Sequence, residues 1–416
     1  MEDRVAETYF VGLELNNREV RMCIYDASEK DAVTVMVTAG GSHAECPAHM
    51  TYIEKNGQWK YGIEADYFAD KEGCVLFDDI LETLLSGKDF EANGRSFSPE
   101  EVLAEMIRQA LSFGGIKRPG EQINILMLTV PGITKAFTKE AEKAFGILGI
   151  NTKRAYVQCY DESFFMHTYY QKQEVYSRKV GLFYFDDDSR VSFKILNTDR
   201  TTKPATASVT NEGSTDLTFD VRKKDERFAA FIKEKTEGKE FSSFFLVGNG
   251  FNRHWAKESL NILCRAQRKV FYGDNLYAKG ACFAAREKSQ QAQIKDTIFL
   301  GNDLIRKNIG MELIKDGVPA YYPLITAGIH WYEAENECDI ILNYEKELVF
   351  RVSRMENGKR ANYKMQLPGL PERPPKTTRL NIKLRFESPE KCNVTVSDMG
   401  FGELFPSSNL TWADSL

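Results

Sequence analysis

Runs of apolar residues alternate with polar turns from the start of the chain. Residues 8–15 and 20–25 are β-rich segments on either side of Asn16 and Asn17. Asparagine readily adopts the positive φ that a tight turn requires. A third apolar run spans residues 32–38. The pattern predicts that the chain begins as a β-hairpin and continues as a meander.

The apolar spacing then changes to that of a helix. Residues 98–101, Ser-Pro-Glu-Glu, supply an N-cap serine, a proline at the first helical position and a glutamate at N3, which together form a capping box. The continuous apolar run 123–130 is typical of a strand that is buried on both faces. A second helix over 138–148 and a short strand near 154–157 follow. Strand, helix and strand in this order predict an α/β layer.

The opening pattern recurs in the second half of the chain. Residues 179–185 and 191–196 form another predicted hairpin, and a strand at 244–247 is followed by predicted helices at 252–265 and 275–286. Two meanders, each followed by helices, indicate an internal duplication.

Beyond residue 296 the segments become short and alternating, and prolines cluster between residues 365 and 380. This texture predicts an all-β domain after a boundary near 290–300. We therefore expect a first domain over 1–295, with one lobe at about 1–175 and the other at about 176–295. A β-rich domain over 296–416 follows.

Composition narrows the class of protein. The chain is 42% hydrophobic and has 55 Lys and Arg against 60 Asp and Glu, with no basic run. It should therefore be globular, and nucleic acid is not an expected partner. The sequence lacks an apolar stretch of about 20 residues, and its N-terminus is acidic, so we expect a cytoplasmic protein without a membrane span. The eight cysteines form no Cys-x-x-Cys pair, which favours reduced thiols over disulfides or a zinc site.

Several segments, in the same order along the chain, resemble the DnaK (seventy-kilodalton heat-shock) family. Residues 11–15 (VGLEL) resemble that family's V-G-I-D-L, and 129–131 resemble its T-V-P. Residues 272–281 resemble its D-P-x-x-A-V-x-x-G-A-A helix, the most specific of these matches. In the β-rich domain, 367–371 resemble L-x-G-I-P, and 391–398 resemble G-x-L-x-V-S-A-x-D. The resemblance implies an α/β protein with a duplicated actin-like (ribonuclease H-like) ATPase fold, followed by a small all-β sandwich like the DnaK peptide-binding domain.

The residues that this family uses to bind ATP are replaced here. Its phosphate loops need glycines, because a Cβ would keep the backbone N–H groups away from the phosphates. The chain has Asn16, Asn17 and Arg18 in place of G-T-T, and Asp186, Asp187 and Asp188 in place of G-G-G. Gly248, Asn249 and Gly250, between a predicted strand and a predicted helix, are the best surviving fragment of a nucleotide site.

Further replacements affect the residues that hold the cation and orient the attacking water. Glu14 and Tyr184 stand where the family has two aspartates, and Asp66 stands where it has a lysine. The segment between Leu196 and Phe244 is also too short for the subdomain that closes over adenine in that family. We therefore predict no catalytic residue, no metal ligand and no cofactor.

These losses favour a pseudo-ATPase that acts as a chaperone-like or scaffold protein. It would bind protein or peptide partners through the C-terminal β domain, at a sheet edge or between loops. The sequence ends at Leu416, so we expect no helical lid. Two alternatives stay open: an active ATPase that binds ATP and Mg²⁺ at an atypical site made by the nine loop residues named above, or an actin-like assembly subunit. No oligomeric state is predicted.

Overall fold

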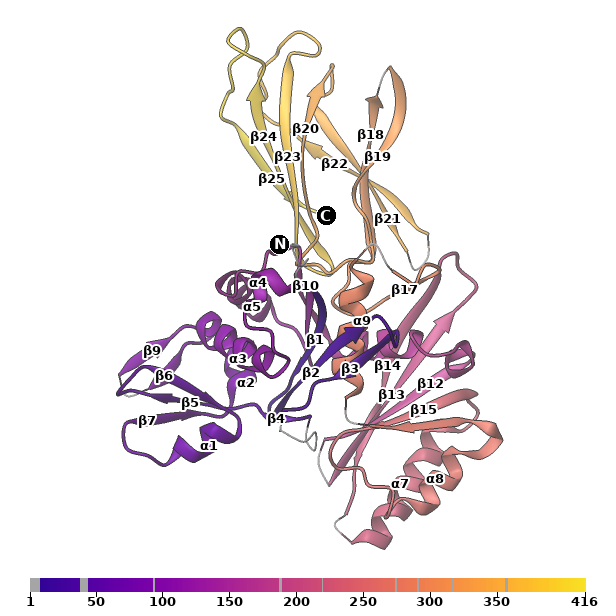
Figure 1. The fold of residues 1–416 in the computed structure, drawn as a ribbon. Coiled ribbons are helices and arrows are strands. Elements are labelled where there is room, and N and C mark those ends of the chain that lie inside the picture. The colour runs from indigo at the N-terminus through magenta and orange to yellow at the C-terminus, as the bar shows by residue number, and fades with distance from the viewer. Residues whose placement is uncertain are drawn as a thin grey trace. The chain divides into compact units, whose positions relative to one another are not determined.

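The structure of the protein is a computed structural model (Figure 1). It describes residues 8–37, 44–92, 94–186, 189–218, 220–273, 275–289, 292–315, 317–355 and 358–416. The chain divides into two compact units, Met1–Phe299 and Leu300–Leu416. The first unit mixes helices and sheets, whereas the second is built from strands.

A sheet with the order β11-β10-β1-β2-β3 forms the centre of the first half of unit 1, and β4 pairs with β2 at its side. Strand β1 is antiparallel to β2 and parallel to β10, and β10 is parallel to β11. The strands of this first sheet are β1 (Tyr9–Leu15), β2 (Glu19–Asp26), β3 (Asp31–Thr34), β4 (Cys46–Pro47), β10 (Ile123–Val130) and β11 (Ala155–Cys159). The predicted opening hairpin and the buried strand over 123–130 are confirmed.

A second sheet, in the order β16-β15-β12-β13-β14-β17, forms the centre of the second half. Its strands are β12 (Lys179–Phe185), β13 (Arg190–Asp199), β14 (Ala205–Asp216), β15 (Phe241–Val247), β16 (Lys269–Tyr272) and β17 (Thr297–Phe299). Strand β12 is antiparallel to β13 and parallel to β15, and β15 is parallel to β16. The five strands from β16 to β14 therefore repeat the order and directions of the five from β11 to β3.

Helices cover both sheets. They are α3 (Pro99–Phe113), α4 (Pro119–Gln122), α5 (Lys135–Ile147), α6 (Tyr160–Tyr169), α7 (Val221–Thr236), α8 (Lys257–Leu263) and α9 (Leu276–Glu287), with 3-10 turns at Gln173–Tyr176 and Arg265–Gln267. The predicted capping box begins α3, since the Ser98 backbone N–H donates to Glu101 Oε2 at 3.1 Å. Helices α7 and α8 pack together, and their apolar side chains join the core of the second sheet, which includes Phe183 and Phe228 (Figure 1).

Helix α9 packs against β1 and against α6, and glycines make both approaches possible. A Cβ on Gly12 of β1 would stand 2.2 Å from the Cys282 backbone nitrogen, and one on Gly280 would stand 2.0 Å from the Ser163 carbonyl oxygen. Any side chain at these two positions would push the backbones apart. Gly280 lies in the segment that carries the most specific resemblance to the DnaK family.

A small insertion lies between β4 and α3. It contains a three-stranded sheet, a short hairpin and two helices: β5 (Met50–Ile53), β6 (Gln58–Tyr61), β7 (Cys74–Phe77), β8 (Phe90–Ala92), β9 (Arg95–Phe97), α1 (Ile63–Ala69) and α2 (Ile80–Ser86). Aromatic rings hold it together: Tyr52, Trp59 and Phe97 lie in mutual contact, with ring centroids 4.7–5.1 Å apart. Asp66, the residue in place of the family's lysine, lies on α1 and is 2.8 Å from His49 Nε2.

One predicted helix begins later than expected. The helix over 252–265 is the shorter α8, which starts at Lys257. Asn252 instead caps a turn by accepting a hydrogen bond from the His254 backbone N–H at 2.9 Å. The carboxylate of Asp225, on α7, accepts hydrogen bonds from the backbone N–H groups of Glu258 and Ser259 at 2.7 and 3.0 Å. A tertiary contact therefore sets where α8 begins.

Unit 2 consists of two four-stranded antiparallel sheets, β19-β18-β21-β22 and β20-β23-β24-β25. The strands are β18 (Lys307–Lys315), β19 (Val318–Ile325), β20 (Glu335–Leu342), β21 (Glu347–Arg354), β22 (Arg360–Gln366), β23 (Thr378–Ser388), β24 (Lys391–Gly400) and β25 (Thr411–Ser415). Alternate residues of both sheets, among them Phe350 and Phe386, contribute to one shared apolar core. The predicted all-β region is confirmed as a sandwich.

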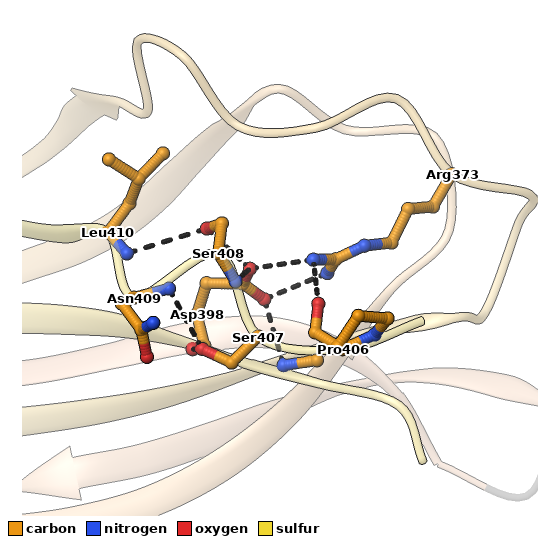
Figure 2. A network of polar contacts seen from close by, with 8 residues as sticks. Arg373, Asp398, Pro406, Ser407, Ser408, Asn409 and Leu410 are labelled. Carbon is orange, nitrogen blue, oxygen red and sulfur yellow. Dashed lines mark hydrogen bonds and ion pairs between the residues drawn. The ribbon is translucent and has the colours of Figure 1, made fainter. Parts of the chain in front are cut away.

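A buried ion pair fixes the loops at one end of this sandwich (Figure 2). Arg373, in the proline-rich connection before β23, donates from both guanidinium nitrogens to Asp398 of β24 at 2.8 Å each. The same carboxylate accepts from the backbone N–H groups of Gly400 and Ser408, and from the Ser408 hydroxyl, at 2.6–3.0 Å. Arg373 also donates to the carbonyl oxygen of Pro406 at 2.8 Å. The network ties the proline-rich connection to the β24–β25 loop.

Candidate functional site

The structure brings together part of the predicted nucleotide site. Asn16 and Arg18 lie in the β1–β2 turn, Asp186 follows β12, and Gly248 and Asn249 follow β15. These five residues line one small cavity. Asn17 and Gly250 are not among the residues that line it. Asp187 and Asp188 fall outside the described residues.

The cavity is too small for a nucleotide. Its volume is about 20 Å³. A single water needs about 10–15 Å³, whereas pockets for drug-sized ligands span roughly 300–1,000 Å³. The described residues around the cavity thus leave room for about one water.

The β1–β2 turn binds its own backbone. Asn16 Oδ1 accepts hydrogen bonds from the backbone N–H groups of Arg18 and Glu19, at 2.8 and 2.9 Å. In a phosphate loop, such N–H groups face the phosphate oxygens. Here the side chain of Asn16 takes that place, as asparagine commonly does in turns.

A charged cluster connects the two halves of unit 1 across the cavity. Arg21, on β2, forms an ion pair with Glu19 at 2.8 Å and donates to Asn249 Oδ1 at 3.2 Å. The Asn249 amide nitrogen lies 3.5 Å from Glu19 Oε2. Arg18 Nη1 donates to the carbonyl oxygen of Asp186 at 2.7 Å. Both arginines that face the cavity are therefore engaged by protein groups.

Glu14 lies beneath this cluster and is only 2% exposed. Its Oε1 accepts a hydrogen bond from the Tyr160 hydroxyl at 2.8 Å, while its Oε2 is buried without a partner among the described residues. Burial raises the pKa of Glu14 to about 7, although the charge of Arg21 and the Tyr160 hydrogen bond both lower it.

Aromatic rings fill the space beside Glu14. Tyr160 stacks on Tyr277 of α9 with ring centroids 3.7 Å apart, and the ring of Tyr184 lies 6.0 Å from that of Tyr277. Tyr184 is the residue that replaces one of the family's aspartates. Its ring lines the cavity where the resemblance would place a carboxylate.

The glycine turn after β15 has a structural explanation. Gly248 has a φ of +100°, and a Cβ there would stand 2.1 Å from the carbonyl oxygen of Phe185. The glycine is thus required for the close passage of two strand ends. Because α8 begins only at Lys257, residues 248–250 are not at a helix N-terminus, and the predicted phosphate-binding geometry is wrong.

Four residues that shape this site were not predicted from the sequence: Glu19, Arg21, Tyr160 and Tyr277. The sequence held one signal for Arg21. It lies directly opposite Glu14 across the β1–β2 hairpin. Opposite charges in facing positions of two otherwise apolar strands are typical of cross-strand pairing. No comparable pattern marks the two tyrosines.

Neither a metal-binding group nor a membrane-spanning helix is found among the described residues. Among the described residues, no three His, Cys, Asp or Glu side chains are grouped in a way that would hold a metal ion. No helix in the described part of the chain is long and apolar enough to cross a membrane. All eight cysteines are free thiols.

The fold is that of a mixed α/β protein with a C-terminal β-sandwich. Its sequence matches the family described as "Family of unknown function (DUF5716) C-terminal" over residues 31–302. This match covers more than half of the chain, and the protein belongs to that family. Residues 304–416 match "Domain of unknown function (DUF8552)", so the two matches divide the chain almost where the structure does. No curated protein matches the sequence.

Proposed function

We propose that this protein is a DnaK-like pseudo-ATPase, a chaperone-like or scaffold protein that binds protein segments. The fold assignment rests on repetition: the two sheets of unit 1 share strand order and strand directions, as expected of a duplicated actin-like fold. The sandwich of unit 2 would then correspond to the DnaK peptide-binding domain. The proposed binding of protein segments by unit 2 depends on this correspondence between the two domains.

The observation that carries the pseudo-ATPase proposal is the filled cavity between the two hairpins. Among the described residues, a volume of about 20 Å³, a turn in which Asn16 accepts two backbone N–H groups and two engaged arginines all speak against a bound triphosphate. The alternative of an atypical ATPase would require these groups to separate. The alternative of an actin-like assembly subunit does not depend on the cavity.

Thermal unfolding with and without Mg-ATP tests this proposal. A ligand at 100 times its dissociation constant should stabilise the folded state by about 2.7 kcal/mol, which raises Tm measurably. We expect no change in Tm with millimolar Mg-ATP, Mg-ADP or Mg-GTP, while an ATP-binding control protein shifts under the same conditions. A rise in Tm that Arg18→Ala abolishes would place a nucleotide at this cavity and establish the atypical ATPase instead.

Binding of protein segments is tested separately. The full-length protein is applied to an array of peptides that varies in charge and hydrophobicity, and bound protein is detected by antibody. We expect a defined subset of peptides to bind. If none binds and sedimentation shows concentration-dependent assembly, the assembly-subunit alternative replaces this proposal.

A further inference from the structure

A groove of about 800 Å³ crosses the outer face of the β19-β18-β21-β22 sheet in unit 2. All four strands contribute to it, with Tyr321 and Pro323 from β19, Asn308 from β18, Arg351 from β21, and Arg360 and Asn362 from β22. Its volume lies within the range of about 300–1,000 Å³ that is typical of ligand sites. It is much larger than the cavity between the hairpins of unit 1.

A glycine on the central strand lets the Tyr321 ring lie flat against the sheet beside this groove. Gly310 lies directly between Pro323 and Arg351 in the strand register. A Cβ at Gly310 would stand 2.4 Å from the Tyr321 hydroxyl oxygen, so the tyrosine ring reaches over the glycine. The Tyr321 ring therefore occupies the place that a side chain on the central strand would take, and it forms one wall of the groove.

The lining is positively charged. Among the described residues, the ten that line the groove include two arginines and no carboxylate. Arg351 forms an ion pair with Glu312 at 2.6 Å, and both side chains are about half exposed. Arg360 is exposed and has no ion pair within the part of the chain that the structure describes.

The outer face of the opposite sheet provides a contrast. There, Lys383 is paired with Glu337 at 3.2 Å, and Asn381 donates to Glu337 and Asp339 at 3.1 and 2.9 Å. Its charges are balanced by neighbours on adjacent strands.

The groove sheet also carries balanced pairs, Arg351 with Glu312 and Lys364 with Glu347. It differs in Arg360, which lines the groove and has no ion pair among the described residues.

We propose that this groove binds an extended acidic segment of a partner protein. The inference rests on the proposed function and specifies its ligand: carboxylates would pair with Arg351 and Arg360, and the chain would pass beside Tyr321. Arginine binds carboxylates through two parallel hydrogen bonds, which gives both affinity and orientation. Four strands about 4.8 Å apart span about 14 Å, enough for roughly four extended residues.

The binding mode is across the face of the sheet and not along the β19 edge. Two of the eight residues of β19, Pro319 and Pro323, have no backbone N–H. A strand that adds to an edge needs those donors, and prolines there are a common device against edge pairing. The β19 edge is therefore a poor site for the sheet-edge mode, which is one of the two modes expected from the sequence.

Fluorescence anisotropy with the full-length protein tests the inference. The probe is a fluorescein-labelled octapeptide of alternating glutamate and glycine, and the comparison peptide replaces each glutamate with lysine. We expect saturable binding of the glutamate peptide only, with an affinity that falls as salt rises. Arg360→Glu should weaken binding at least tenfold, because it removes one cation and adds repulsion.

Lys383→Glu, on the outer face of the opposite sheet, is the matched control. It makes the same charge change at an exposed site and should leave the affinity within about twofold of wild type. Both variants must keep the wild-type Tm, which exposed positions favour. Equal affinities for Arg360→Glu and wild type, or no binding of the glutamate peptide, would overturn the groove assignment.

The peptide array separates this outcome from a failure of the proposed function. If other peptides bind the array but the glutamate probe does not, the groove inference is wrong and the protein-binding proposal stands. If no peptide binds in either assay, both are wrong. If an octathymidylate binds and Arg360→Glu weakens it equally, the groove is a general polyanion site and the assignment to acidic peptides is wrong.

Discussion

Glu14 and Asp398 are both buried carboxylic acids that lie near an arginine, yet their pKa values move in opposite directions. The pKa of Asp398 lies well below its usual range, chiefly because Arg373 donates two hydrogen bonds to it. The pKa of Glu14 is raised to about 7, chiefly by burial. Burial raises the pKa of both groups, so the opposite directions depend on what opposes burial at each site.

The difference lies in the hydrogen bonds to the charged form. Asp398 accepts five: two from Arg373, two from backbone N–H groups and one from Ser408 (Figure 2). Glu14 accepts one short hydrogen bond, from Tyr160, and a longer one from Asn16 at 3.5 Å. A carboxylate keeps its charge in the interior only when donors replace the lost water. Asp398 and Arg373 form an ionic clamp, whereas Glu14 is buried with too few donors to favour its charged form.

Replacement of Asp398 by alanine should have the largest effect. It leaves Arg373 buried and unpaired, and breaking one partner of a buried pair costs about 3–5 kcal/mol. We expect unit 2 to lose that much free energy of unfolding, measured by urea denaturation with Trp331 and Trp412 as probes. Asp339→Ala, at an exposed ion pair 4.0 Å long, should cost less than about 1 kcal/mol.

From the lowered pKa of Asp398 we expect unit 2 to lose stability in acid. Because the folded pKa of Asp398 is depressed, its contribution is complete above the unfolded pKa of about 3.9 and is lost as pH falls below that value. Wild-type unit 2 should therefore lose stability below about pH 4, whereas Asp398→Ala should show a flatter dependence. If Asp398→Ala lowers the free energy of unfolding by less than about 1 kcal/mol at pH 7, the ion pair of Asp398 with Arg373 does not stabilise unit 2 as proposed.

Glu14→Gln tests the opposite case. The folded pKa of Glu14 is about 7 against an ordinary value of 4.5, so the folded state retains a proton that the unfolded state has lost. Stability is therefore lost as pH rises from about 4.5 to 7, by up to about 3 kcal/mol at 1.36 kcal/mol per unit. A glutamine cannot ionise, and Arg21 keeps Glu19 as its partner.

We expect Glu14→Gln to be more stable than wild type at pH 8 and close to it near pH 4.5. Hydrogen exchange of peptides that cover β1 and β2 reports the local free energy at each pH. Glu337→Gln, on the exposed face of unit 2, is the control and should change neither value. A pH-independent difference between Glu14→Gln and wild type would show that the carboxyl group does not titrate there.

The parts of the fold that the sequence predicted are those with local signals. The capping box at Ser98, the apolar strand over 123–130 and both hairpins depend on residues close together in the chain. Helix α7 was not predicted: its sequence, VRKKDERFAAFIKEKT, is highly charged, and its apolar positions are recognised as one face only once the second sheet is known. The start of α8 depends on Asp225, more than 30 residues earlier.

In the candidate site, too, local features were predicted from the sequence and long-range contacts were not. That Asn16 closes a turn follows from the chemistry of asparagine and is confirmed. The contact between Arg21 and Asn249 joins residues 228 positions apart, and the Tyr160 hydrogen bond to Glu14 joins residues 146 apart. The absence of glycines from residues 16–18 and 186–188 is visible in the sequence, but the side-chain contacts across the cavity could be identified only from tertiary structure.

Tyr160→Phe should have the smallest effect on stability. It tests how far the Tyr160 hydroxyl lowers the pKa of Glu14. The hydroxyl donates to Glu14 Oε1 at 2.8 Å, so its removal should raise the pKa of Glu14 further. The ring still stacks on Tyr277, so packing changes little. We expect a loss of about 1–2 kcal/mol of unfolding free energy at pH 8, where the hydrogen bond is to a carboxylate, and a smaller loss at pH 5.

In the Glu14→Gln background the extra loss at pH 8 should disappear, because the acceptor is then uncharged at every pH. Tyr156→Phe removes an exposed hydroxyl that donates to the Lys153 carbonyl oxygen, and it controls for loss of the phenol group alone. Equal losses at pH 5 and pH 8 would mean that Tyr160 stabilises unit 1 through its hydroxyl without regard to the charge of Glu14.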